Sequence, residues 1–92
     1  MDRGEAYKLL AARLNEARVE GYAALLARVG QPARSETEHH NGEAIVIDVA
    51  VSWDDRERGT VLVCATANGP STWMTQRLEE SIILGPDAPA AG

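Results

Sequence analysis

Phenylalanine is absent from this 92-residue sequence, and there is only one cysteine, Cys64. A single cysteine excludes an internal disulfide framework and a cysteine-based zinc site. No apolar run approaches the roughly 18 residues that a membrane-spanning helix needs, since the longest, over 44–51, is interrupted by Asp48. The first residues also lack the apolar segment of a secretory signal. We therefore expect a cytoplasmic protein that does not bind membranes.

Positive charge is also scarce, because nine Lys and Arg residues stand against fourteen Asp and Glu, a net charge of -5. Residues 1–34 contain six basic and four acidic side chains, whereas residues 35–92 contain three and ten. Such a chain repels phosphate backbones, so we expect no nucleic-acid partner. The asymmetry has two interpretations: a plain solubility feature, or an acidic face that docks a partner protein with a basic surface.

The N-terminal third has helical periodicity. Apolar residues three and four apart predict a helix over 3–19, with a stripe of Tyr7, Leu10, Ala11, Leu14 and Ala17. Gly21 interrupts the pattern, and a second stripe predicts another helix over 22–29. One long kinked helix is the alternative.

The middle of the chain changes to a period of two. Between 44 and 53, large apolar residues occupy every second position: Ile45, Ile47, Val49, Val51 and Trp53. This pattern predicts a strand with one buried face, and Trp53 at its end is expected in the core. A second strand over 60–67 should point Val61 and Val63 one way and Leu62 and Cys64 the other.

The rest of the chain is less regular. Asn68-Gly69-Pro70-Ser71 predicts a turn, residues 72–76 a short strand, and residues 77–84 a brief helix with Leu78, Ile82 and Ile83 on its apolar side. Upstream, Asn41-Gly42 is a hairpin signal that would make 34–40 an edge strand. That pairing sets Glu38 opposite Ile45 and Glu36 opposite Ile47, which places two carboxylates on the apolar face. Inward-pointing charges do guard edge strands against aggregation.

These elements predict one α+β domain over 1–86, followed by a flexible tail over 87–92. Two N-terminal helices would pack on one face of an antiparallel meander of three or four strands, and a short C-terminal helix would follow. If the opposite face, with Leu62 and Cys64, stays uncovered, a homodimer through the sheet would bury it.

No residue set has the spacing of a catalytic or metal site. His39 and His40 lie among carboxylates, but neighbours in a strand point to opposite faces. Asp48 is expected on the outer face, either exposed or paired with a cross-strand neighbour such as Arg77 or Thr66, while a buried catalytic role is the alternative. Cys64 is expected to be structural. We therefore predict no cofactor, no metal and no catalytic residue.

Several local motifs together resemble a family of small bacterial proteins of unknown function. They are Asn41-Gly42 before the strand, Trp53-Asp54-Asp55, the Gly69 turn, and Glu80-Ser81-Ile82-Ile83 before Gly85-Pro86-Asp87. The resemblance supports the order of helices followed by a meander. It implies no known activity.

By elimination, the sequence favours a protein–protein interaction module of accessory, inhibitor or immunity type, without catalysis. Candidate contact residues are Trp73, Met74, Asp54, Asp55 and Glu57. The alternative is a small-molecule-binding or metal-dependent catalytic domain that uses Asp48 with His39 or His40.

Overall fold

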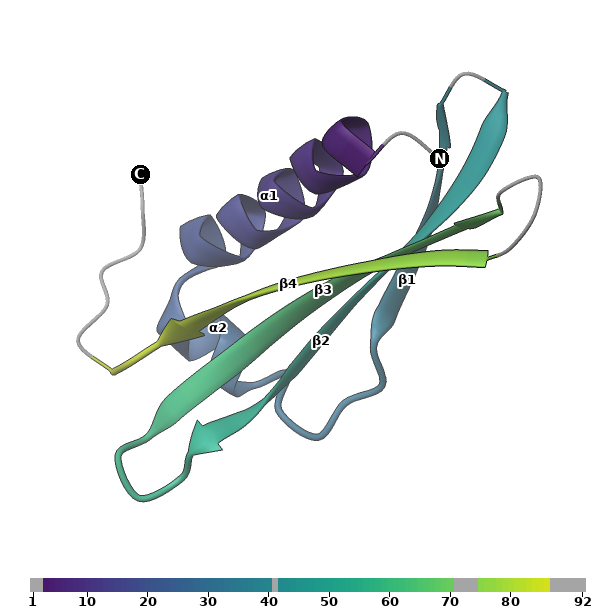
Figure 1. Ribbon diagram of the computed structural model, residues 1–92. Coiled ribbons are helices and arrows are strands. Elements are labelled where there is room, and N and C mark those ends of the chain that lie inside the picture. Colours follow the sequence, from purple (N-terminus) through teal and green to yellow (C-terminus); the bar gives the residue numbers. More distant parts are fainter. Residues whose placement is uncertain (1–2, 41, 71–74, 87–92) are drawn as a thin grey trace.

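The chain folds as a helical layer on a four-stranded antiparallel sheet, which confirms the α+β class (Figure 1). The structure is a computed structural model that describes residues 3–40, 42–70 and 75–86. Its elements are α1 (Arg3–Glu20), α2 (Tyr22–Leu26), β1 (Arg34–His40), β2 (Glu43–Asp55), β3 (Thr60–Pro70) and β4 (Thr75–Leu84). The strands lie in the order β1-β2-β3-β4, so each pairs with its neighbour in sequence. The proposed tail over 87–92 lies outside the described residues. No helix within the described ranges is long and apolar enough to span a membrane.

α1 lies along one face of the twisted sheet and buries a narrow stripe against β3 and β4 (Figure 1). The buried residues are Ala6, Leu10, Leu14 and Ala17. The predicted stripe included Tyr7 and Ala11, which is wrong, because Tyr7 is 41% exposed and Ala11 is exposed. α1 ends at Glu20, and α2 ends at Leu26 rather than at residue 29.

The alternation in β2 and β3 is confirmed. The strand side chains buried under the helices include Ile45, Ile47, Val51, Val61, Val63, Ala65 and Ala67. Asp48, Leu62 and Cys64 have the opposite parity, and each is only partly buried. We call the sheet face that carries them the outer face. Trp53 is 37% exposed, so its predicted core position is wrong. The β2–β3 register shifts just after Trp53, and α2 packs against β3 at this end of the sheet.

β1 is an edge strand in the predicted register, with Glu36 opposite Ile47 and Glu38 opposite Ile45. His40 pairs with Glu43, so β1 and β2 form the antiparallel pair expected from the Asn41-Gly42 signal, although Asn41 itself lies outside the described residues. Gly42 has φ of 79°, a left-handed conformation that side-chain-bearing residues rarely adopt. The sequence therefore predicts this hairpin correctly.

The predicted C-terminal helix over 77–84 is wrong, because these residues form most of strand β4. Leu78 and Leu84 are buried and Ile82 is half-buried, whereas Ile83, which was expected beside them, is 57% exposed. A spacing of four residues, as between Leu78 and Ile82, fits a helical turn and also two strand repeats. Pairing with β3 over the whole of β4 decides in favour of the strand.

The predicted turn is wrong for residues 68–70, and Ser71 lies outside the described residues. β3 continues through Asn68 and Gly69 to Pro70, because Asn68 pairs with Arg77 and Gly69 with Gln76. Of the predicted strand over 72–76, Thr75 and Gln76 belong to β4, and the other three residues lie outside the described part of the chain.

Candidate functional site

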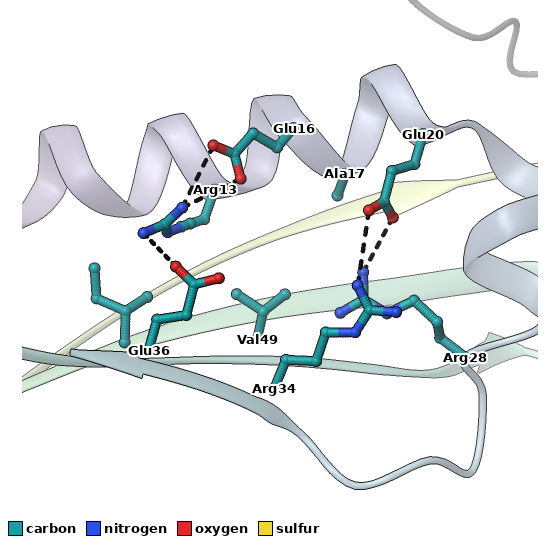
Figure 2. Close-up of a pocket in the computed structure, with 9 residues that line it drawn as sticks. Arg13, Glu16, Ala17, Glu20, Arg28, Arg34, Glu36 and Val49 are labelled. Carbon is teal, nitrogen blue, oxygen red and sulfur yellow. Dashed lines mark hydrogen bonds and ion pairs between the residues drawn. The ribbon is translucent and has the colours of Figure 1, made fainter. Parts of the chain in front are cut away.

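A polar hollow lies between α1 and the first two strands (Figure 2). Its volume is about 60 Å³, room for only a few water molecules. Ala17, Ile47 and Val49 contribute its apolar lining, and the rest of the lining is charged: Arg13, Glu16, Glu20, Arg28, Arg34 and Glu36.

Arg13 organises one end of the hollow. Its side chain is 17% exposed and forms ion pairs with Glu36 at 2.6 Å, with Glu16 at 3.4 Å and with Glu38. We call these four residues the Arg13 cluster. It explains how β1 carries two carboxylates on the helix-facing side of the sheet, because α1 supplies the cation that they need.

Glu20 organises the other end. It forms ion pairs with Arg28 at 3.1 Å and with Arg34 at 3.9 Å (Figure 2). The end of α1, the segment after α2 and the start of β1 therefore meet there. The guanidinium groups of the hollow therefore already face glutamates. Because their charge is compensated, the hollow is better suited to hold α1 against β1 than to bind an anionic ligand. Sequence analysis assigned no role to Arg13. The signal was the pair of inward-facing glutamates in β1.

The outer face has a different chemistry, and no element of the described ranges packs over it (Figure 1). The register places Ser35, Asp48, Thr66 and Glu79 side by side across the four strands. We call these residues the acidic row. Asp48 accepts a hydrogen bond from the Ser35 hydroxyl, and Thr66 is buried between the two carboxylate-bearing positions. The row contains two carboxylates and no cation.

Cys64 lies next to the acidic row, and its thiol donates a hydrogen bond of 2.8 Å to Glu79 Oε1. Burial raises the pKa of the Cys64 thiol above its ordinary value, and this hydrogen bond raises it further. Because a nucleophilic cysteine needs the opposite shift, the raised pKa and the location in β3 agree with the structural role predicted for Cys64.

The carboxylates of the β2–β3 loop take part in the turn itself. Asp55 Oδ1 accepts hydrogen bonds from the backbone amides of Glu57 and Arg58, and Asp54 Oδ2 accepts a side-chain hydrogen bond from the Thr60 hydroxyl. Asp54 and Glu57 remain exposed, whereas Asp55 is half-buried. Tyr22 of α2 fixes the loop by donating its hydroxyl to the Gly59 carbonyl at 2.5 Å.

The residues of the alternative catalytic or metal site are not brought together. Asp48 pairs across the strands with Ser35, and His39 lies four residues further along β1, which is about 13 Å in a strand. His40 pairs with Glu43. Among the described residues, no group of three or more His, Cys, Asp or Glu side chains could hold a metal ion. Trp73 and Met74, the two apolar contact candidates, lie outside the described ranges.

Comparisons with known proteins identify no relative: no family model matches the chain, and no curated protein or solved structure matches it. The resemblance to a family of small bacterial proteins therefore stays a prediction.

Proposed function

We propose that this chain is an acidic protein–protein interaction module of accessory, inhibitor or immunity type, without catalysis, and that its outer face docks a basic protein surface. The observation that carries the proposal is the acidic row. Asp48 and Glu79 lie two strands apart on a face that neither described helix covers, and the hydrogen bonds they accept come from neutral donors. Exposed Asp54 and Glu57 add negative charge at the β2–β3 end of the molecule.

The distribution of cations supports the same assignment. Arg13, Arg28 and Arg34 are held in ion pairs on the helix side, where they neutralise glutamates of α1 and β1. Among the described residues, no ion pair joins a cation to the carboxylates of the acidic row, and Arg77 is the one cation of β4 on the same face. A basic partner would supply the missing compensation, and complementary charge chiefly raises the rate of association. The free thiol of Cys64 suits a reducing cytoplasm, which we include in the proposal.

The test is a quantitative pull-down from the native host with matched baits. The three baits are the wild type, Asp48→Asn and Glu80→Gln. Asp48→Asn removes one charge from the acidic row and keeps the oxygen that accepts from Ser35. Glu80→Gln changes the net charge equally on an exposed residue of the opposite parity. Any protein enriched by the wild type is then purified, and its affinity for each variant is measured at low and physiological salt.

We expect Asp48→Asn to weaken binding about fivefold and higher salt to weaken it further, because both reduce electrostatic attraction. Glu80→Gln should bind like the wild type. The proposal is wrong if the two variants bind equally well, or if the affinity is insensitive to ionic strength.

A further inference from the structure

The two edges of the sheet are protected to different extents. β1 carries only polar side chains, follows Pro32, and points Glu36 and Glu38 into the Arg13 cluster. Inward-pointing charges and nearby proline are devices that discourage another strand from pairing with an edge. β4 has only weaker versions of both devices, because Pro86 follows it and Glu80, its one charge of helix-facing parity, is exposed. It pairs with β3 without a register shift over its ten residues, and it contains Leu78, Ile82, Ile83 and Leu84.

Two charged side chains, Arg77 and Glu79, also lie along the edge of β4 that pairs with no other described strand. Arg77 is exposed, and its only interaction among the described residues is an electrostatic one with Cys64 on the neighbouring strand. Glu79 has the same parity two positions further on, and of its two oxygens only Oε1 accepts the Cys64 thiol. A cation and an anion are thus available on one side of an edge strand.

We infer that β4 pairs with β4 of a second copy of this chain, antiparallel and centred on Leu78, to form a continuous eight-stranded sheet. In this register Arg77 of each copy faces Glu79 of the other. The two-fold symmetry of the dimer therefore gives two Arg77–Glu79 ion pairs. Centring on Arg77, Glu79 or Glu80 would place like charges opposite each other, which destabilises a strand pair. Centring on Ser81 would place Glu79 opposite Ile83 and Glu80 opposite Ile82. Charge complementarity therefore selects the Leu78 register, which uses only residues 75–81.

An edge-to-edge dimer is also preferable to one that stacks the two outer faces. Stacking would enclose the Asp48 and Glu79 carboxylates of both copies with half as many Arg77 side chains to compensate them. Desolvating uncompensated carboxylates is costly. Edge pairing leaves both outer faces open on the same side of the larger sheet. The inference does not depend on the proposed function, because the dimer forms through β4 whether or not a partner binds the outer face.

The decisive experiment is a charge swap followed by analytical ultracentrifugation over a wide range of protein concentration. Arg77→Glu and Glu79→Arg each place like charges opposite each other in the dimer, and we expect each to weaken self-association about tenfold. The double variant Arg77→Glu/Glu79→Arg restores opposite charges and should recover an affinity close to that of the wild type. Circular dichroism checks that each variant is folded.

Hydrogen exchange of the wild type locates the contact without any substitution. Amides of β4 should gain protection as the protein concentration rises, while amides of β1 should not. A protein that stays monomeric at high concentration, single swaps that associate like the wild type, or a double swap without recovery would each overturn the inference. Concentration-dependent protection in β1 instead of β4 would overturn it as well.

Discussion

The two sides of α1 contact the two edges of the sheet through different interactions, ion pairs towards β1 and apolar packing towards β4. Towards β1, Arg13 forms ion pairs with Glu36 and Glu38. Towards β4, Tyr7, Ala11, Leu14 and Ile82 form the apolar part of the neighbouring surface, and Arg18, Glu80 and Ser81 lie at the same place. Burial of a large aliphatic side chain contributes about 1.5–3 kcal/mol, whereas an exposed ion pair contributes up to about 1 kcal/mol. The apolar flank therefore provides more of the stability. The ionic flank keeps the edge strand in register and makes it unsuitable for pairing with other chains.

Substitution of Arg13 is expected to have the largest effect, and it tests whether ion pairs hold α1 against β1. Arg13→Met keeps an aliphatic side chain in the hollow that Ile47 also lines, and leaves Glu36 and Glu38 without the Arg13 cation. We expect a loss of about 1–3 kcal/mol in the free energy of unfolding, because half-buried Glu38 and exposed Glu36 lose the cation that compensates them. Urea unfolding of the variant and the wild type measures it.

Two controls separate charge compensation from simple loss of an arginine. Arg18→Met changes an exposed residue of the same helix and should cost less than about 0.5 kcal/mol. Replacing Glu36 and Glu38 by Thr in the Arg13→Met background should recover much of the loss. Equal effects of Arg13→Met and Arg18→Met would show that the Arg13 cluster does not hold β1.

Two neighbouring isoleucines in β4, Ile82 and Ile83, test the contribution of apolar packing on the β4 side of α1. Ile82 is half-buried and packs against the core, whereas Ile83 points to the outer face. Ile82→Thr should cost about 1–2 kcal/mol through lost burial, and Ile83→Thr less than about 0.5 kcal/mol. Both substitutions keep a β-branched side chain, so strand propensity changes little. Thermal unfolding at low protein concentration compares them. Equal losses would favour the helix that the sequence predicted over 77–84.

The same residues show how far sequence reasoning reaches. Residues 45–51 were predictable, because alternation over several large aliphatic side chains fits only a strand. Leu78 and Ile82 were ambiguous, since their spacing suits two periodicities and only pairing with β3 distinguishes them. The role of Arg13 depends on how α1 is rotated above β1, which is a tertiary property. Likewise, the excess of carboxylates was visible in the sequence, but the side-by-side placement of Asp48 and Glu79 required the strand register.

The smallest expected effect is a change in the pKa of the Cys64 thiol, which donates a hydrogen bond to Glu79 on the outer face. Burial and the carboxylate both raise the pKa of this thiol. The folded state therefore holds the thiol proton more tightly than the unfolded state. This contribution to stability is present below the ordinary thiol pKa and is lost as the pH rises through the higher pKa of the folded protein. Glu79→Gln removes the negative charge, so it should lower the thiol pKa and reduce that alkaline loss.

The rate of Cys64 alkylation as a function of pH measures this effect directly, because the thiolate is the reactive form. At low protein concentration, we expect the profile of Glu79→Gln to move to lower pH than that of the wild type. Glu80→Gln, of opposite parity on the same strand, should leave the profile unchanged. If the two variants react alike, the Glu79 carboxylate does not control the thiol. Since Cys64 adjoins the acidic row, an unshifted profile would also mean that Glu79 turns away from β3 towards solvent or towards a second chain.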